Sequence, residues 1–202
     1  MSAHADDELK PSVTEGYKVG EKKSVAEYAN LDAHDESLAR WKESLGVGAA
    51  AAQGSIGEPG DKRTVVILEL ALLINGRPDV VINLDETSAV EKLGENPFTI
   101  KEGSEYRMRV KFRVQHEVIS GLRYLQLVKR KKIPVDKSDQ MMGSYGPNTK
   151  ENPFYEKTFA EEEAPAGMLY RGTYDALSKF MDDDHKEHLS FKWTFEIKRS
   201  WD

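Results

Sequence analysis

The strongest constraint on the fold is a strict alternation of apolar and charged side chains over residues 105–114. Every even position in this run is apolar and every odd position is charged, and residues 189–198 repeat the alternation with apolar side chains at the odd positions. Period-two patterning places successive side chains on opposite faces of a pleated strand. Two such half-buried strands, far apart in sequence, predict an antiparallel sheet protein whose apolar faces meet across a core.

Further strands follow from apolar runs bounded by turn residues. Gly, Pro, Asn, Asp and Ser clusters separate these runs at fairly regular intervals. Seven to nine short strands with regular turns predict an all-β, immunoglobulin-like β-sandwich. We expect strands near 64–74, 79–84, 97–101, 105–118, 122–130, 154–159, 167–180 and 188–199.

The first sixty residues differ from the rest of the chain. They carry 11 acidic and 6 basic side chains, which accounts for most of the net charge of −6. Residues 1–23 hold few apolar anchors and cannot offset their ordering entropy, so we expect them to be disordered alone. Residues 46–61 are rich in Gly and Ala and are typical of a linker. The sequence therefore predicts a flexible, partly helical arm over residues 1–60 and a sandwich domain over 61–202.

Two short helices are expected in the arm, at about 24–31 and 35–45. Ser24 and Glu27 form a capping box, and Leu38, Trp41 and Leu45 give the second helix an apolar stripe that ends at Gly46. Both helices are below the ~12–15 residues at which an isolated helix becomes marginally stable in water. Their apolar stripes either pack on the sandwich or bind a partner.

Composition excludes several classes of function. The chain has no cysteine, so disulfides, thiolate catalysis and cysteine-ligated zinc are excluded. An acidic balance argues against nucleic acid as the main partner. The N-terminus shows no signal peptide and no apolar run reaches the ~20 residues of a membrane span. We expect a soluble, cytoplasmic protein.

No catalytic or metal-binding pattern is present. His185 and His188 lie beside the acidic run 182–184, but their spacing matches no familiar metal site, and an exposed acidic turn explains them. The Gly143–Ser144–Tyr145–Gly146 run lacks the spacing of a nucleophile elbow and is followed by Pro147. We therefore expect no enzyme activity, no catalytic residues, no metal and no cofactor.

Two features keep two interpretations each, and a third has one. The basic cluster 129–132 is either a solvated strand end or a patch that binds phosphate or acidic lipid. The acidic run 161–163 reads as a solvated turn on composition alone. The apolar inner faces form either a filled core or a cavity that admits a hydrocarbon chain, and periodicity does not distinguish these two. The inward-facing set is expected to include Leu70, Leu72, Phe98, Tyr106, Met108, Val110, Phe112, Leu125, Phe191, Trp193 and Phe195.

Several motifs resemble one known family. The runs 31–38 (LDAHDESL), 101–107 (KEGSEYR), 143–147 (GSYGP), 162–169 (EEAPAGML), 171–174 (RGTY) and 182–190 (DDDHKEHLS) resemble the Rho GDP-dissociation inhibitors. The resemblance runs in order from about Tyr17 to the last residue. It implies a sandwich whose sheets separate to admit a geranylgeranyl group, and an arm that folds into a helical hairpin on the switch regions of a Rho GTPase.

The resemblance also implies site residues. The prenyl pocket is expected to be lined by Leu70, Leu72, Phe98, Tyr106, Val118, Leu125 and Trp193. Contacts to the GTPase are expected from Tyr17, Leu31, Asp35, Glu162, Glu163 and Asp184, with the two glutamates facing the basic tail that precedes the prenylated cysteine.

The function that the resemblance implies is inhibition of GDP dissociation from prenylated Rho-family GTPases, mainly in the GDP-bound form, and their extraction from membranes as a 1:1 complex. The alternative from another class is a general carrier of prenyl or acyl tails that does not touch the switch regions. A structural adaptor with a filled core is a third possibility. Residual binding of an unprenylated GTPase distinguishes the first from the second.

Overall fold

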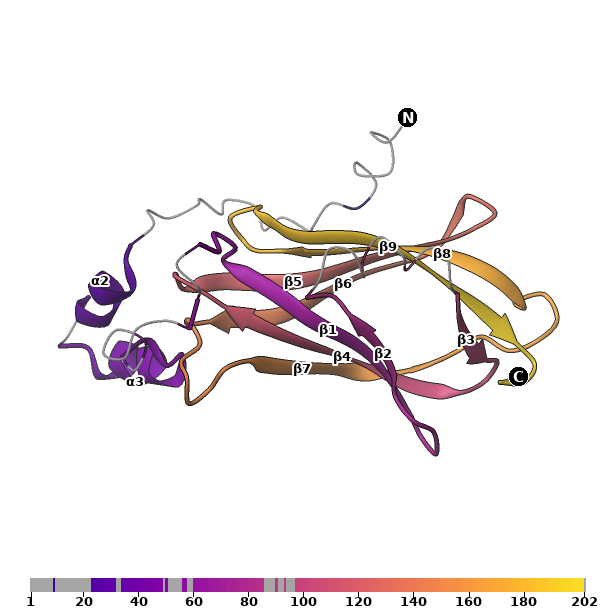
Figure 1. The fold of residues 1–202 in the computed structure, drawn as a ribbon, viewed down its shortest axis with the longest axis horizontal. Helices are drawn as coiled ribbons and strands as arrows, with labels where there is room; N and C mark the ends of the chain where they lie inside the picture. The colour runs from indigo at the N-terminus through magenta and orange to yellow at the C-terminus, as the bar shows by residue number, and fades with distance from the viewer. Residues whose placement is uncertain are drawn as a thin grey trace.

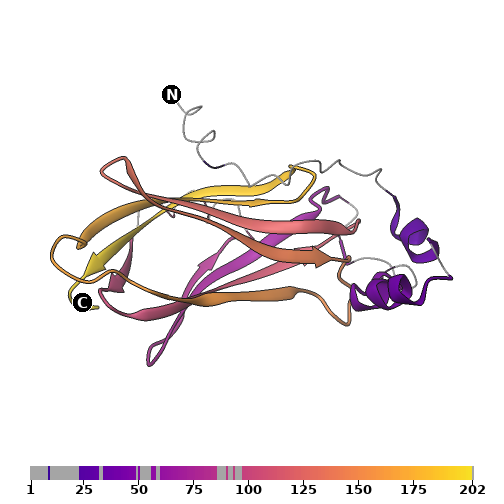
Figure 2. The ribbon, with the colours of Figure 1, turned by 180° about the vertical axis from the view of Figure 1, so that it is seen from behind.

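The structure is a computed structural model that describes residues 9, 23–31, 34–48, 50, 56–57, 60–85, 90, 93 and 97–201. Within these residues, nine strands form two facing sheets, and two short helices lie beyond one end of the sandwich (Figure 1). The view from behind shows the same two layers, with the C-terminus at the end opposite the helices (Figure 2). The predicted all-β, immunoglobulin-like sandwich with helices in the N-terminal part is confirmed.

The two predicted helices are present, each slightly shorter than expected. Helix α2 spans Val25–Asn30, and Ser24 and Glu27 form the predicted capping box at its start. Helix α3 spans Glu36–Ser44, and the carboxylate of Asp35 accepts hydrogen bonds from the backbone N–H groups of Ser37 and Leu38. These side-chain caps satisfy backbone donors that the first turn leaves without partners.

The first sheet has four antiparallel strands in the order β2-β1-β4-β7. Strand β1 (Val65–Ile74) lies between β2 (Val80–Asn83) and β4 (Glu105–Val114), and β7 (Tyr155–Glu163) forms the far edge. The alternation predicted for 105–114 is observed, because Met108, Val110, Phe112 and Val114 are all buried while the arginines and lysine between them are half-exposed or exposed.

The second sheet has five strands in the order β3-β9-β8-β5-β6. It contains β3 (Phe98–Lys101), β5 (Ile119–Arg130), β6 (Ile133–Tyr145), β8 (Gly172–Met181) and β9 (Glu187–Lys198). Among the described strands of this sheet, only the β3–β9 pair is parallel. The apolar faces of the two sheets meet in one core, built around large buried rings such as Phe112, Tyr124 and Phe180.

Strand β6 is absent from the sequence-based prediction. It is an edge strand that pairs only with β5, and most of its side chains are exposed, so it shows no apolar alternation. The turn before it consists of Lys131 and Lys132, whose φ angles of 50° and 69° are left-handed. Two-residue hairpin turns of type I′ need a left-handed φ at both residues and usually use Asn and Gly. The basic cluster therefore comprises the last two residues of β5, Lys129 and Arg130, and the hairpin turn that follows them.

Strand β5 is apolar on both faces. Leu122, Tyr124 and Val128 belong to the central core. Leu125 and Leu127 point the other way and pack with Leu177 and Leu9 in a second cluster. The prediction that Leu125 faces the core between the sheets is wrong, because the strand register places Tyr124 there.

Described residues between helix α3 and the sandwich contact the sandwich. Val47 and Ala50 are buried, and the Ile56 N–H donates to the Asn148 carbonyl at 3.1 Å. Gly146 has no room for a side chain, because a Cβ there would lie 2.1 Å from the Leu45 carbonyl oxygen. The end of α3 therefore rests on the loop that follows β6, and the division of the chain near residue 60 stays a prediction.

Candidate functional site

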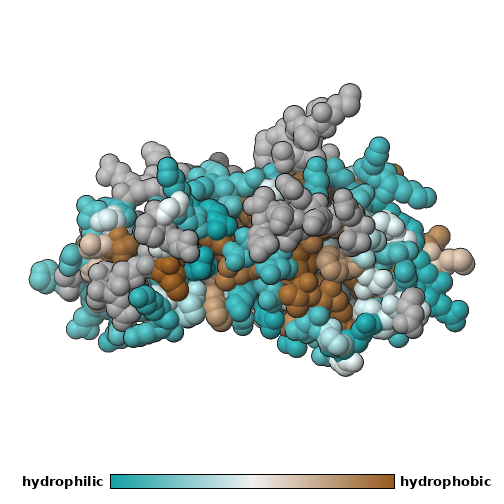
Figure 3. Space-filling view, in the orientation of Figure 1, coloured by the Kyte–Doolittle hydropathy of each residue, from teal (hydrophilic) through white to brown (hydrophobic). Residues whose placement is uncertain are grey.

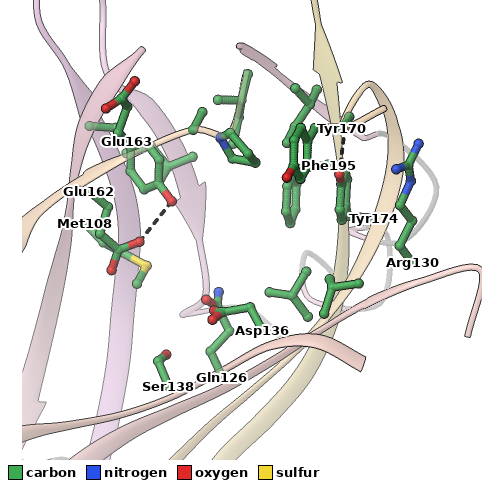
Figure 4. Close-up of a pocket in the computed structure, with 18 of the residues that line it drawn as sticks. Met108, Gln126, Arg130, Asp136, Ser138, Glu162, Glu163, Tyr170, Tyr174 and Phe195 are labelled. Atoms are coloured by element: carbon green, nitrogen blue, oxygen red, sulfur yellow. Dashed lines mark hydrogen bonds between the residues drawn. The ribbon is translucent and has the colours of Figure 1, made fainter. Parts of the chain in front are cut away.

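A cavity of about 680 Å³ opens between the two sheets at the end away from the helices. This volume is within the ~300–1,000 Å³ of small-molecule sites. Its walls come from both sheets and from the loop between β7 and β8 (Figure 4). The lining is mainly apolar and aromatic and includes Leu72, Ile100, Tyr106, Met108, Val128, Val135, Leu169, Tyr170, Tyr174, Trp193, Phe195 and Ile197.

The aromatic wall is fixed by ring packing and by buried hydrogen bonds. The rings of Tyr174 and Phe195 stack with centroids 5.1 Å apart and planes 5° from parallel. The indole N–H of Trp193 donates to Ser178 Oγ at 3.0 Å, and Ser178 Oγ lies 2.8 Å from the Tyr124 hydroxyl. Because these hydroxyls are buried, Trp193 is held in one orientation against the cavity.

Carboxylates line the opposite side of the cavity. Glu162 and Glu163 come from the end of β7, and Asp136 comes from β6 (Figure 4). The Tyr106 hydroxyl donates to Glu162 Oε2 at 2.9 Å. Burial, followed by the charge of Glu162, raises the pKa of the Tyr106 phenol, so this hydroxyl stays protonated and keeps donating. The cavity thus combines an apolar interior with an acidic side.

The β7–β8 loop is anchored by ionic and polar contacts. Arg171 binds Glu102 with Nη2–Oε1 and Nε–Oε2 distances of 2.7 and 2.9 Å, and the Gly167 N–H donates to the same carboxylate. The Arg171 guanidinium, followed by the Gly167 N–H, lowers the pKa of Glu102 to about 2. These contacts hold the loop in place over the cavity mouth.

The predicted prenyl-pocket residues are only partly brought together. Leu72, Tyr106 and Trp193 line the cavity. Leu70 is buried in the core but does not line the cavity. Phe98 does not line the cavity either, and its ring packs edge-on against Trp193, with the two ring centroids 6.1 Å apart.

The other two predicted pocket residues lie elsewhere. Val118 is half-buried in the β4–β5 turn, whereas the cavity is lined by the first residues of β4. Leu125 belongs to the cluster on the outer face of the second sheet and is not part of the wall. Lining residues outside the predicted set include Val135 and Leu169, on the strand and loop that show no apolar alternation.

The predicted GTPase contacts occupy two regions. Leu31 at the end of α2, Asp35 at the start of α3 and Asp184 in the β8–β9 turn lie at the end that carries the helices. Glu162 and Glu163 line the cavity at the other end. Tyr17 is outside the described residues.

Two of the three residues of the helix α3 stripe are exposed, whereas Leu45 is half-buried where α3 meets the loop after β6. Leu38 and Trp41 are exposed, and no α2 residue is buried. Hydrophobic side chains are visible at this end among hydrophilic neighbours (Figure 3). Leu38 and Trp41 thus leave an apolar surface at this end of the molecule, and the binding of a partner there stays a prediction.

His188 has a structural partner. Its Nε2 lies 2.9 Å from Asp182 Oδ2, and both side chains are almost fully buried. Burial tends to raise the pKa of Asp182, but the hydrogen bonds from His188 and from the Lys186 N–H together lower it. Over the part of the chain that the structure describes, no group of three or more His, Cys, Asp or Glu is placed to hold a metal ion. No described helix is long and apolar enough to cross a membrane.

Comparisons with known proteins agree on one family. Residues 2–200 match the family model described as RHO protein GDP dissociation inhibitor. The chain is 52% identical to the Rho GDP-dissociation inhibitor of Schizosaccharomyces pombe over 183 residues, covering 91% of this chain and 86% of that protein. Identity is 50% to the Saccharomyces cerevisiae protein, covering 90% and 89% of the two chains. It is 42% to human Rho GDP-dissociation inhibitor 1, covering 92% and 86%. The family comprises regulatory binding proteins and not enzymes, and this chain belongs to the Rho GDP-dissociation inhibitor family.

Proposed function

We propose that this protein binds prenylated Rho-family GTPases, mainly in the GDP-bound form, shelters the geranylgeranyl group in the cavity, and slows GDP release through its N-terminal helices. Its place of action is the cytoplasm, where it holds each GTPase in a 1:1 complex. The observation that carries the proposal is the cavity of about 680 Å³ between the sheets, with an aromatic wall and an acidic side.

The cavity suits a hydrocarbon chain. Burying apolar groups is worth ~0.8 kcal/mol per CH₂, so a chain of about twenty carbons gains on the order of 10 kcal/mol. A bilayer offers a similar gain. Extraction from a membrane then depends on additional protein contacts, which the exposed α3 residues Leu38 and Trp41 can supply.

The acidic side suits the segment that precedes the lipid. Glu162, Glu163 and Asp136 line the same cavity as the apolar wall. A basic peptide that enters behind a prenyl group would meet these carboxylates. Charge complementarity of this kind adds orientation and association rate more than affinity.

The two helices suit the switch regions. Each is short and only partly packed, so most of its stability has to come from a partner. Helices that bind the switch loops hold these loops closed, and nucleotide release needs them to open. Asp35 and Asp184, both at this end of the molecule, are the proposed charged contacts.

The lipid site is tested by titrating the full chain with a fluorescent geranylgeranylated cysteine peptide. Val135 lines the cavity and is 53% exposed, whereas Val81 is 50% exposed and does not line it. Val135→Asp should weaken binding by about tenfold or more, because a charge at the wall opposes an apolar ligand. Val81→Asp should bind as the wild type does. Equal affinities in the two variants would contradict the proposed site.

The helical contact is tested with a GDP-bound GTPase that lacks the prenyl group. Asp35 also caps α3, so Asp35→Ala removes both the cap and the charge, whereas Asp35→Asn keeps a capping side chain. If Asp35 contacts the GTPase through its charge, both variants should bind more weakly and release GDP faster. No binding of unprenylated GTPase by the wild type would favour the general lipid carrier instead.

A further inference from the structure

The rim of the cavity carries an unusual concentration of exposed apolar side chains. Five of the ten large hydrophobic side chains that are exposed among the described residues lie here. Met168 and Leu169 are 80% and 83% exposed, and Ile133 is 66% exposed. Val135 and Tyr170 complete the set. We call residues 129–133, 135 and 168–170 the rim surface.

The two segments of the rim surface are joined by hydrogen bonds. The Arg130 guanidinium, at the end of β5, donates to the carbonyl oxygens of Leu169 and Arg171 in the β7–β8 loop. The Tyr174 hydroxyl donates to the Tyr170 carbonyl at 2.6 Å. Because Arg171 is in turn bound to Glu102, the exposed apolar side chains sit on a fixed loop.

The same surface is basic. Lys129, Arg130, Lys131 and Lys132 follow one another at the β5–β6 turn, and the last two are exposed. Figures 1 and 2 show this hairpin projecting beyond the sheets, at the end opposite the helices. Glu162 and Glu163 lie on the other side of the mouth, since Figure 4 places them across the cavity from Arg130 and Tyr170, whereas Asp136 follows Val135 on β6.

The rim surface is continuous with the cavity. Val135, Leu169 and Tyr170 are exposed at the rim and also line the cavity. A layer that covered the rim surface would therefore cover the mouth as well. Apolar side chains beside clustered lysines are the combination by which peripheral proteins bind anionic bilayers.

We propose that the rim surface docks on an anionic phospholipid bilayer and places the cavity mouth at the membrane. Met168, Leu169 and Ile133 enter the interfacial layer, while Lys131 and Lys132 meet anionic headgroups. The docking itself does not depend on the proposed function. Its consequence does: a prenyl chain would pass from bilayer to cavity without crossing water.

The test measures binding of the full chain to vesicles by co-sedimentation at low salt. Vesicles contain phosphatidylserine and phosphatidylcholine, or phosphatidylcholine alone. Binding should require phosphatidylserine and fall as salt is raised. Lys131→Gln/Lys132→Gln should lower the partitioning of the protein onto anionic vesicles by about 30-fold, because each lysine near such a surface contributes roughly a fivefold gain in binding. Ile133→Ser/Met168→Ser should lower it about tenfold, and neither residue lines the cavity.

Matched controls lie elsewhere on the surface. Lys62→Gln/Lys150→Gln removes two exposed lysines outside the rim surface, and Val81→Ser/Met141→Ser removes two exposed apolar side chains that do not line the cavity. Both should bind vesicles as the wild type does. Failure of the wild type to bind anionic vesicles, or equal losses in rim and control variants, would overturn the proposal.

A probe separates a membrane from a protein partner. Because the chain has no cysteine, Met168→Cys takes a single polarity-sensitive fluorophore. Its emission should shift to the blue with anionic vesicles. A shift caused by unprenylated GTPase without vesicles would make this face a protein interface and refute membrane docking. Titration with the prenylated peptide, without vesicles, reports on the proposed function separately.

Discussion

Ser178 is the hydroxyl on which the orientation of Trp193 depends. It is fully buried, accepts a hydrogen bond from the Trp193 indole N–H at 3.0 Å and shares another with the Tyr124 hydroxyl at 2.8 Å. Ser178→Ala removes both. Tyr124 still accepts from Gln126 at 3.1 Å, but the buried indole N–H loses its acceptor. A buried unsatisfied donor costs ~1–3 kcal/mol, and the second lost bond adds about 1 kcal/mol.

We therefore expect Ser178→Ala to lower the free energy of unfolding by about 3 kcal/mol, which corresponds to a fall in Tm of roughly 6–12 °C for a chain of this size. Urea unfolding followed by circular dichroism measures the change. The control is Ser190→Ala, at a half-exposed position on β9, which should change stability by less than ~0.5 kcal/mol.

A double-mutant cycle isolates the Trp193–Ser178 bond. Trp193→Phe removes the donor, so adding Ser178→Ala to it should cost about 1–2 kcal/mol less than Ser178→Ala costs alone. Costs that add within ~0.5 kcal/mol would refute the argument, because the two side chains would then contribute independently.

Three further predictions concern one ion pair and two glycines with close neighbours. The pKa of Glu102 is lowered to about 2, so its pairing with Arg171 stabilises the fold fully above pH 4.5, the ordinary pKa of a glutamate, and this stability is lost as the pH falls from 4.5 towards 2. NMR titration of the Glu102 carboxyl should show the low pKa, and Arg171→Gln should return this pKa towards 4.5. Gly146→Ala should speed hydrogen exchange in α3 without affecting the sheets, because the new Cβ collides with the Leu45 carbonyl. Gly48→Ala is the control, since a Cβ there meets nothing within 4 Å. Unchanged exchange in Gly146→Ala would contradict the contact between the end of α3 and the loop after β6. Gly121→Ala should lower the free energy of unfolding in urea more than Gly76→Ala does. Both glycines have a left-handed φ, which costs an alanine ~1–2 kcal/mol at either position. Only at Gly121 does the added Cβ also collide with a side chain, the Asp183 carboxylate.

The strongly patterned strands could be predicted from sequence. Strands β4 and β9 alternate between apolar and polar side chains, and their buried faces are the predicted ones. The Ser24 capping box and the Asp35 cap likewise depend on local chemistry, so α2 and α3 were predictable to within a residue or two.

The cavity was less predictable because its walls are set by tertiary contacts. Gln126 faces the cavity while its neighbours Leu125 and Leu127 face outward, which reverses the assignment that hydrophobicity alone favours. Strand β6 begins after a turn of two lysines and has no periodic signal. Val135 and Leu169, which are exposed at the rim, could not be assigned to a wall without knowing the hairpin.

The helices and the cavity mouth lie at opposite ends of the long axis of the sandwich (Figure 1). A single ligand can touch both only if it is long enough to extend along the whole domain. Length thus becomes a selection criterion: once one end is bound, the second contact gains from a high effective concentration only when the connecting segment spans the gap. A cargo with too short a connector is restricted to the affinity of one end.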